Sequence, residues 1–462
     1  MRQAHTTEQI REAEAELMAG LPDGALMRRA AAGLAAVCAQ MLPYVYGARV
    51  LVLAGPGNNG GDALFAAAGL ARRGARCEVI LVADTAHAKA LADFVAAGGR
   101  VVDDLGEPDL VLDGMVGVGG RVGLNGRAAV VAERISDLAA TVVAVDVPSG
   151  VGVDSAELDG QSVRADLTVT FGTNKVGLLA DPASARAGTV ELVDIGLAPY
   201  LGPPAAEALG QDDVRRLLPR PQRGSHKYSR GVLGVAAGSV QYTGAGLLVT
   251  SGAVATGLAG MVRYDGASAE LVRARLPEAV IGRGRVQAWV VGSGIGNSQD
   301  ELVGDILAED LPTVVDADGL RHLPSQCSAP VVLTPHAGEL ADLLQVDRTE
   351  VEARTVWAAA EAARRRDCVV LLKGARSVIA APDGRLRVNT TGVPWLATAG
   401  AGDVLSGVIG SLLAGGLNCF DAACVGAWLH GAAANLASGG GPITAVSVAE
   451  KLPAAVAGVL AD

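Results

Sequence analysis

The chain of 462 residues has few aromatic side chains and no long apolar run. Phe, Trp and Tyr make up 3% of the sequence although hydrophobic residues make up 50%, so the core must consist of Ala, Val, Leu and Ile. Such a core is typical of buried parallel sheets covered by helices. With 19% charged residues, the composition argues against long disordered stretches. Even VLSGVIGSLLAGG, residues 404–416, is short and broken by glycine, which argues against a membrane span.

Excess positive charge and paired cysteines are also missing. The formal net charge of −11 argues against a nucleic-acid partner, because phosphate binding uses Lys and Arg. Six cysteines without CxxC spacing argue against a zinc site or a disulfide framework and favour buried cytosolic thiols. These are Cys38, Cys77, Cys327, Cys368, Cys419 and Cys424. The first residues, MRQAHTTEQIREAEAE, are too polar for a signal peptide, so we expect a cytoplasmic protein without a membrane partner.

Apolar runs of strand length alternate with helical patterns twice along the chain. After predicted helices in residues 6–46, the first set of strands comprises RVLVLAG, CEVILVAD, DLVLDG and TVVAVDVPSG. The second set comprises GVLGVAAG, AWVVGSG, TVVDADG, APVVLTP and CVVLLKG, followed by a hairpin that turns at 383–384. A Pro- and Gly-rich stretch, 203–225, separates them. The sequence therefore predicts an α/β protein of two doubly wound domains, 1–212 and 213–462.

A glycine-rich loop, GPGNNGGD at 55–62, follows the first predicted strand. Its glycines fit G-x-G-x-x-G, a pattern in which backbone N–H groups at a helix N-terminus face an anion. However, Asn58 and Asn59 add amide groups, and the carboxylate of Asp62 would repel a pyrophosphate. A hydroxyl-rich ligand or a monovalent cation therefore fits better than NAD. The alternative is that Asn58 and Asp62 only cap the helix.

Two more aspartates follow neighbouring predicted strands. Asp113 lies in DLVLDGMVGVGGRVG, and Asp146 lies with Ser149 in VVAVDVPSGVGVDS. Ligands of open α/β sheets bind beyond the carboxyl ends of the strands, so we expect these side chains to converge with loop 57–62. A single aspartate at a strand end is more often a cap, but three beside glycine loops indicate a binding site.

The order of NNGGD, DGMVGVGG, DVPSGVGVDS and TVTFGTNKVGLL resembles the NAD(P)H-hydrate epimerase domain over about residues 5–215. The resemblance implies a Rossmann-like fold that binds hydrated nicotinamide nucleotide beside a potassium ion. The substrate contacts that it implies are Asn58, Asn59, Gly60, Gly61, Asp62, Gly117, Val118, Gly119, Gly120, Arg121, Val122, Gly123 and Asp146. The K⁺ ligands that it implies are Asn59, Asp113 and Ser149, whose oxygens suit a hard cation.

For proton transfer in this domain we predict Asp146. Lys175, in TNKVG, is a second candidate, with a solvated or structural lysine as the alternative.

The motif TAGAGDVLSGVIGSLLAGG, 398–416, carries the strongest signal in the chain. Gly400 and Gly402 let the backbone approach a phosphate, and Asp403 begins a helix. A carboxylate there can accept a proton where N–H groups stabilise developing negative charge. A helix merely capped by aspartate is the alternative. The motif resembles the AGAGD loop of the ribokinase-like fold.

Four further motifs narrow this resemblance. They are, in order, HKYSRGVLGVAAGSVQYTGAGLL, VVGSGIGN, VLTPHAGEL and LLKGARSVI. With them, the sequence resembles the ADP- or ATP-dependent NAD(P)H-hydrate dehydratase over about residues 213–460. The implied substrate contacts are Ala245, Gly296, His336 and Asp403, although His336 would be a core histidine in most proteins. The implied nucleotide contacts are Lys373, Gly374, Ala375, Arg376, Ser377 and Gly402, with Mg²⁺ accompanying ADP or ATP.

Together the two resemblances imply repair of NADH and NADPH that have added water to the nicotinamide ring. The first domain would interconvert the R and S hydrates, and the second would dehydrate the S form with ADP or ATP, using Asp403 as base. The family also implies a homo-oligomer. The alternatives are a sugar or hydroxymethylpyrimidine kinase fused to a regulatory Rossmann domain, a non-catalytic binding module, and a dehydrogenase.

Overall fold

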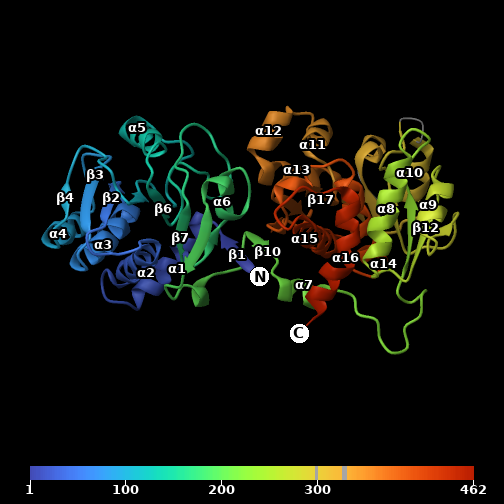
Figure 1. Cartoon of the computed structure of the whole chain (residues 1–462), viewed down its shortest axis with the longest axis horizontal. Coiled ribbons are helices and arrows are strands. Elements are labelled where there is room, and N and C mark those ends of the chain that lie inside the picture. The colour runs from blue at the N-terminus through green and yellow to red at the C-terminus, as the bar shows by residue number, and fades with distance from the viewer. Residues whose placement is uncertain (297–299, 325–329, 462) are drawn as a thin grey trace. The chain divides into compact units, whose positions relative to one another are not determined.

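The computed structural model describes residues 1–296, 300–324 and 330–461, with helices and strands labelled in Figure 1. The described chain forms two compact units. Gln3–Ala206 make up the first unit, and Met1–Arg2 with Glu207–Asp462 make up the second. The division lies a few residues before the predicted domain boundary of 212/213 and inside the Pro- and Gly-rich stretch.

Seven parallel strands form the sheet of the first unit. Their order is β4-β3-β2-β5-β6-β7-β9, and the register places Asp113 opposite Leu53 and Ala144. The strands are β2 (Arg49–Ala54), β3 (Arg76–Leu81), β4 (Arg100–Val101), β5 (Leu110–Gly114), β6 (Thr141–Val145), β7 (Leu167–Phe171) and β9 (Thr189–Val193). Because β2, β5 and β6 are parallel and end level, the loops that follow them meet at one sheet edge.

Helices cover both faces of this sheet, as the doubly wound prediction requires (Figure 1). Along β2, Val50 and Val52 pack in one hydrophobic cluster with α2 and α3, whereas Leu51 and Leu53 pack in another with α5. The helices are α1 (Thr7–Ala19), α2 (Ala25–Met41), α3 (Asn58–Arg72), α4 (Ala88–Ala96), α5 (Gly126–Ile135) and α6 (Val176–Leu179), with 3₁₀ turns η1 (Ala183–Arg186) and η2 (Ala198–Tyr200). A short parallel pair joins β1 (Arg2–His5) to β8 (Asn174–Lys175).

The second unit contains a mixed sheet in the order β13-β12-β11-β14-β15-β16-β17-β18-β19-β10. Neighbouring strands are parallel from β13 to β17, and β17, β18 and β19 are antiparallel. The strands are β10 (Ala206–Ala208), β11 (Val232–Ala236), β12 (Met261–Tyr264), β13 (Val280–Ile281), β14 (Ala288–Val291), β15 (Thr313–Val315), β16 (Val331–Leu333), β17 (Val369–Leu372), β18 (Ser377–Ala380) and β19 (Leu386–Asn389). The predicted hairpin is confirmed, because 383–384 connects β18 to β19 and Gly384 has a φ of +90°.

Helices surround this second sheet as well. They are α7 (Gln211–Leu217), α8 (Thr243–Ala255), α9 (Ala269–Arg275), α10 (Asp300–Leu307), α11 (Ala337–Leu344), α12 (Arg348–Ala353), α13 (Thr355–Arg366), α14 (Ala401–Ala414), α15 (Cys419–Ser438) and α16 (Ala445–Leu460), with 3₁₀ turns η3 (Ala317–His322) and η4 (Pro394–Leu396). The apolar run 404–416 therefore belongs to a buried core helix, α14, and its end.

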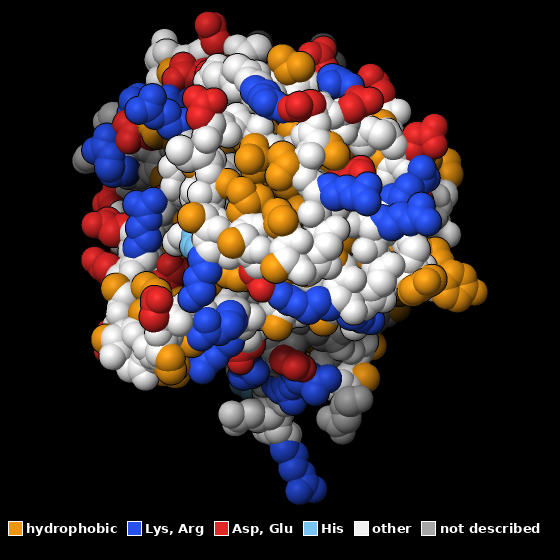
Figure 2. Space-filling view, turned by 90° about the vertical axis from the view of Figure 1, so that its left-hand side faces the viewer, with side chains coloured by type: hydrophobic (Ala, Val, Ile, Leu, Met, Phe, Trp, Pro, Cys, Tyr) orange, Lys and Arg blue, Asp and Glu red, His pale blue; other side chains and the backbone are white. Residues whose placement is uncertain are grey.

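The surface and the thiols agree with the composition. Within the described ranges, no helix has the length and apolar character to cross a membrane. The face drawn in Figure 2 carries Lys, Arg, Asp and Glu side chains around a group of hydrophobic ones. The thiols of Cys38, Cys77, Cys368 and Cys424 are buried, as predicted, and Cys419 is partly buried. Cys327 lies outside the described residues.

Two glycines allow α14 to lie unusually close to α8. A Cβ on Gly407 would lie 2.0 Å from the carbonyl oxygen of Val249, and a Cβ on Gly252 would lie 2.4 Å from that of Val404. No side chain could occupy these positions without separating the helices. This contact fixes the helix whose first turn contains Asp403.

We expect Gly407→Ala to lower the free energy of unfolding of the second unit by about 1–3 kcal/mol, because the added methyl group overpacks the contact between helices. Gly458→Ala is the matched control: Gly458 is also helical, but a Cβ there meets nothing within 4 Å. That variant should gain up to about 1 kcal/mol from helix propensity. Urea denaturation of both variants measures the difference, and equal stabilities would contradict the packing argument.

Candidate functional site

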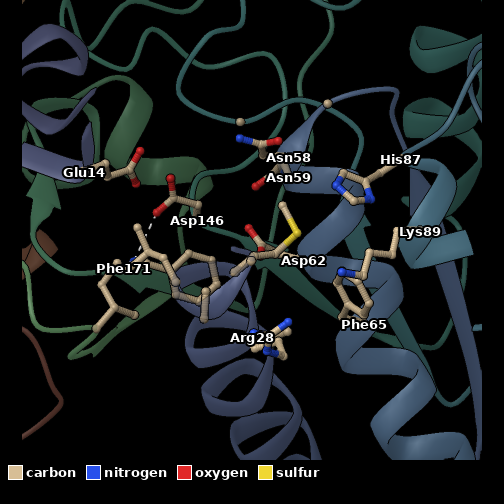
Figure 3. A pocket seen from close by; sticks show the side chains of 18 of the residues that line it. Glu14, Arg28, Asn58, Asn59, Asp62, Phe65, His87, Lys89, Asp146 and Phe171 are labelled. Atoms are coloured by element: carbon tan, nitrogen blue, oxygen red, sulfur yellow. Dashed lines mark hydrogen bonds between the residues drawn. The ribbon is translucent and has the colours of Figure 1, made fainter. Parts of the chain in front are cut away.

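In the first unit, a cavity of about 1480 Å³ lies beyond the carboxyl ends of β2, β5 and β6. Its wall includes the loops after these strands, and Figure 3 shows Asn58, Asn59, Asp62 and Asp146 around it. The other predicted contacts on the wall are Gly117, Val118, Gly119 and Gly120. The predicted contacts that are not part of the wall are Gly60, Gly61, Arg121, Val122 and Gly123.

The glycines of loop 55–62 serve mainly to bring two loops together. A Cβ on Gly55 would lie 1.8 Å from the carbonyl oxygen of Met115, and a Cβ on Gly60 would lie 2.2 Å from that of Gly55. The N-cap of α3 is Gly57, which has no side chain to cap the first turn, so capping by Asn58 or Asp62 is wrong. The N–H groups at this helix end are left for a ligand.

Asp113 and Ser149 form a buried pair beneath the loop after β5. The Ser149 hydroxyl donates to Asp113 Oδ1 at 2.6 Å, and the Ser149 backbone N–H donates to Oδ2 at 2.8 Å. Burial raises the pKa of Asp113 to about 6, although these hydrogen bonds act in the opposite direction. No ion pair of Asp113 occurs in the described part of the chain.

The amide of Asn59 lies near the same loop, because a Cβ on Gly117 would be 3.1 Å from Asn59 Oδ1. Asn59 Nδ2 is buried and has no hydrogen-bond partner among the described residues. The structure therefore brings the three predicted K⁺ ligands to one loop, where oxygens of a carboxylate, a hydroxyl and an amide are available.

Asp146 and Lys175 form an ion pair at the cavity. Lys175 is 1% exposed, and its ammonium also donates to Thr170 Oγ1 at 2.9 Å and to the Phe171 carbonyl oxygen at 3.1 Å. A solvated lysine is thus the wrong interpretation. Asp146 Oδ1 accepts from Lys175, Thr170 and the Phe171 N–H, whereas Oδ2 has no hydrogen bond among the described residues.

Asp62 and Glu14 place two more carboxyl groups on the cavity wall (Figure 3). Burial raises the pKa of Asp62 well above its ordinary value, and the charges of Asp146 and Glu14 add to this effect. Asp62 Oδ1 is buried without a hydrogen-bond partner in the described ranges. A pKa shifted in this direction favours the protonated carboxyl form, which can donate a hydrogen bond to a ligand.

Sequence patterns did not identify several side chains of the cavity wall. They are Glu14, Arg28, Phe65, His87 and Lys89. These residues come from α1, α2, α3 and the start of α4, and none belongs to a motif. Only the folded chain brings them beside the glycine loop.

In the second unit, Asp403 is the third residue of α14. Gly400, with a φ of +85°, is the N-cap and has no side chain to bond to the first turn, so an aspartate cap is wrong. Burial raises the pKa of Asp403 to about 6, and the charge of Asp316 adds to it. A hydrogen bond with Ser293 and the charge of Lys373 act in the opposite direction. Such a carboxylate can act as a base near neutral pH.

The structure brings the predicted nucleotide contacts Lys373 and Gly402 together: a Cβ on Gly402 would lie 3.3 Å from Lys373 Nζ. The Lys373 ammonium forms an ion pair with Asp316 at 2.8 Å. The remaining predicted contacts, Gly374, Ala375, Arg376 and Ser377, connect β17 to β18 and begin β18. Asp316 was not identified from the sequence, although its place at the end of the strand TVVDADG could have indicated it.

The three other predicted substrate contacts also lie at strand ends. His336 follows β16 and is the N-cap of α11, accepting N–H bonds from Gly338 and Glu339. Its side chain is 59% exposed, so a core histidine is wrong. The Lys373 N–H donates to the Pro335 carbonyl oxygen at 2.8 Å, which places His336 beside the nucleotide contacts.

Ala245 and Gly296 lie near the end of β14. A Cβ on Gly294 would be 2.7 Å from the Cβ of Ala245, and the Gly296 N–H donates to Asp318 at 3.0 Å. Within the described ranges, no group of three or more His, Cys, Asp and Glu side chains is arranged to hold a metal ion.

These features define a two-domain α/β enzyme with one candidate site beyond the strand ends of each unit. Comparison with known protein families supports this division into two domains. The family described as NAD(P)H-hydrate dehydratase matches residues 233–452, and the family described as YjeF-related protein N-terminus matches residues 23–177.

Full-length relatives show the same pairing of domains. The chain is 44% identical over 459 residues to the bifunctional NAD(P)H-hydrate repair enzyme Nnr of Mycobacterium leprae, covering 95% of this chain and 94% of that protein. It is 34% identical to the Nnr enzyme of Moorella thermoacetica, covering 84% and 83%. The chain therefore belongs to the family of bifunctional NAD(P)H-hydrate repair enzymes, which confirms the predicted family and enzyme class.

A solved structure resembles the second unit. The ADP/ATP-dependent NAD(P)H-hydrate dehydratase of Bacillus subtilis, co-crystallised with ATP/Mg²⁺, is 29% identical. The TM-score is 0.52, and the match covers 55% of this chain and 98% of that one. Together with the parallel sheet of the first unit and the mixed, mainly parallel sheet of the second, this match confirms the predicted fold class. The kinase alternative is not favoured.

We expect Lys175→Met to lower the free energy of unfolding by about 3–5 kcal/mol, because it leaves Asp146 and two carbonyl groups without their buried donor. Lys89→Met is the matched control, since Lys89 lines the same cavity but is exposed. Its effect should stay within about 0.5 kcal/mol. Chemical denaturation measures both variants. A small effect of Lys175→Met would contradict a structural role for this lysine.

Proposed function

We propose that this chain repairs hydrated NAD(P)H in two steps, one in each unit. The first unit epimerises the R and S hydrates, and the second dehydrates the S form with ADP or ATP. The observation that carries this proposal is the arrangement at the start of α14. There, Asp403 has a pKa of about 6 and lies in the same helical turn as Gly402, and a Cβ on Gly402 would lie 3.3 Å from the Lys373 ammonium.

Dehydration requires a poor leaving group to become a good one. Asp403 takes the proton of the hydroxyl at ring carbon six while that oxygen attacks the terminal phosphorus of the nucleotide. The N–H groups of α14 and the Lys373 ammonium stabilise the charge on the transferring phosphoryl group. The ring nitrogen lone pair then expels phosphate from carbon six, and loss of a proton from carbon five restores the ring double bond. With ADP, the products are NAD(P)H, AMP and phosphate.

Mg²⁺ bound with the nucleotide supplies positive charge to the phosphates in such reactions. The carboxylate of Asp316 already accepts four hydrogen bonds, so it is not available as a ligand for the ion. Asp403 stays available as the base. Mg²⁺ is therefore expected to enter with ADP or ATP, as in the Bacillus subtilis dehydratase co-crystallised with ATP/Mg²⁺.

Epimerisation requires the same hydroxyl to leave carbon six and water to add to the opposite face. The Oδ2 atom of Asp146, free of hydrogen bonds in the described structure, is the proposed proton-transfer atom. Lys175 keeps Asp146 in place through their ion pair. The protonated carboxyl group of Asp62 can donate a hydrogen bond to the departing hydroxyl.

A potassium ion fits beside this cavity. Asn59, Asp113 and Ser149 would hold it, and the buried Asp113 carboxylate would gain the positive charge that no described side chain supplies. Bound there, K⁺ supplies a fixed charge next to the loops after β2 and β5. The Oδ1 atom of Asn59 would add an amide oxygen to the ligand set, since it lies beside Gly117 on the loop after β5.

The location and partners follow from the substrates and the charge. A repair enzyme for NAD(P)H that uses ADP belongs in the cytoplasm, and the net charge of −11 supports the absence of a nucleic-acid partner. Neither feature points to a membrane partner. The homo-oligomer implied by the family stays a prediction, which light scattering tests.

With a mixture of R- and S-NADHX and ADP, we expect the enzyme to convert both hydrates to NADH. Asp403→Asn should slow dehydration by about a hundredfold or more, since it removes the base, and should leave epimerisation intact. The Asp146→Asn variant should consume only the S hydrate, because it lacks the proposed proton-transfer group for epimerisation. NADH absorbance, phosphate release and chromatography of the two hydrates measure these outcomes. Loss of both activities in Asp403→Asn would show that the division of labour is wrong.

We expect K⁺ to raise the melting temperature of the enzyme at pH 7.5 more than at pH 5. Burial raises the pKa of Asp113 from its ordinary value of 3.8 to about 6, so the fold loses stability as the pH rises between these values, and above about 6 the carboxylate is ionised. K⁺ binds that ionised form, so its stabilisation should disappear as the pH falls. Asp113→Asn should abolish the K⁺ effect, whereas Asp137→Asn, at an exposed position, should retain it. Equal K⁺ effects in both variants would exclude Asp113 as a ligand.

A further inference from the structure

One buried carboxylate of the second unit is not explained by the proposed mechanism. Asp316 ends β15 and is 1% exposed. Its Oδ1 atom accepts hydrogen bonds from Lys373 Nζ and Thr334 Oγ1, both at 2.8 Å. Its Oδ2 atom accepts from Ser293 Oγ at 3.1 Å and from Ser406 Oγ at 2.8 Å. Four donors thus fill the four acceptor positions of one carboxylate.

These donors come from four different elements of the site. Ser293 follows β14, Thr334 follows β16, Lys373 follows β17, and Ser406 lies on α14 one turn after Asp403. A carboxylate that bonds to all of them ties the carboxyl ends of the parallel strands to the helix that carries the base. Burial alone would raise the pKa of Asp316, but Lys373 and the hydroxyl groups outweigh burial and keep it below its ordinary value, so the group stays charged.

Asp316 also reaches Asp403 through Ser293. The single hydroxyl proton of Ser293 can be donated either to Asp316 Oδ2 or to the Asp403 carboxylate. The charge of Asp316 and burial favour the protonated form of Asp403, whereas Ser293 and the ammonium of Lys373 favour the ionised form.

Two further titratable groups lie nearby. Glu339 of α11 is 3.9 Å from Lys373 Nζ. His430 of α15 bonds to the Ala401 backbone, and burial lowers its pKa to about 4, so it is neutral at working pH. Neither group adds a second negative charge directly at Asp403.

We propose that Asp316 is the positioning residue of the dehydratase site: it fixes Lys373 for the nucleotide and, through its charge and Ser293, keeps Asp403 able to take the substrate proton. This inference rests on the proposed dehydratase function. Without the negative charge of Asp316, Asp403 would be a weaker base, and Lys373 would lose its nearest counter-charge. One carboxylate would therefore couple nucleotide binding to proton transfer.

The test is the pH dependence of kcat/KM for S-NADHX with saturating ADP. For the wild-type enzyme, activity should rise with pH through about 6, as Asp403 ionises. Asp316→Asn should lower the midpoint of this rise by about one pH unit, because it removes a negative charge near Asp403. Ser293→Ala should raise the midpoint by about half a unit, because it removes a hydrogen bond that favours the ionised form of Asp403. Asp316→Asn should also weaken ADP binding about tenfold, which equilibrium titration measures independently of turnover.

Ser411→Ala is the matched control. Ser411 is a buried serine on the same helix, and it contacts Thr256 rather than Asp316. This variant should lose some stability but keep the wild-type pH dependence of kcat/KM and the wild-type affinity for ADP. If Asp316 had only a structural role, Asp316→Asn would likewise lower stability. The midpoint of the pH dependence would then not shift in opposite directions in Asp316→Asn and Ser293→Ala.

The outcomes separate this inference from the proposed function. If the wild-type enzyme shows no ADP-dependent dehydration, the proposed dehydratase function is wrong. If the wild-type enzyme is active but neither Asp316→Asn nor Ser293→Ala shifts the pH dependence of kcat/KM, the proposed positioning role of Asp316 is wrong. If Asp316→Asn does not fold, Ser293→Ala decides: an upward shift of the midpoint supports the proposal, and an unchanged midpoint refutes it.

Discussion

The cost of placing a carboxylate in the low-dielectric space at the end of a buried parallel strand is the constraint on which both sites depend. The chain meets this cost in three different ways. Asp113 receives only neutral donors, from Ser149 and the backbone, and so keeps an uncompensated charge. Asp146 receives the ammonium of Lys175. Asp316 receives an ammonium and three hydroxyl groups. In the function that we propose, each arrangement has a different role: Asp113 binds a cation, Asp146 transfers a proton, and Asp316 links two functional side chains.

Close backbone contacts hold these carboxylates in position. In the first unit, glycines at 55 and 60 remove the side chains that would keep the loops after β2 and β5 apart. In the second unit, glycines at 252 and 407 let α8 and α14 touch through their backbones. Loops and helix ends packed in this manner have little freedom to move, which preserves the geometry that electrostatic catalysis requires. The many glycines of the chain therefore serve rigidity at the sites as much as backbone flexibility.

Much of the fold could be predicted because local patterns determine it. The predicted strands are short apolar runs between helical patterns, and the hairpin turn at 383–384 has its own sequence signature. The buried strand β7, LTVTF, was not predicted, because threonines interrupt its apolar residues. The positions of Asp113 and Asp403 could be predicted for the same reason, since both follow directly from a strand or a glycine turn. Burial and pairing could not, because they depend on contacts between distant segments. Nothing near Lys175 in the sequence shows that its ammonium points inward, and the hydroxyl groups around Asp316 come from strands and a helix far apart in the chain.

The cysteines of this chain bear on its durability. Burial raises the pKa of the Cys38, Cys77 and Cys424 thiols to about 12, so a negligible fraction is thiolate at neutral pH. Peroxides attack the thiolate, and access to these sulfur atoms is blocked as well. These three thiols are therefore poor targets for oxidation in an enzyme that repairs damaged coenzyme.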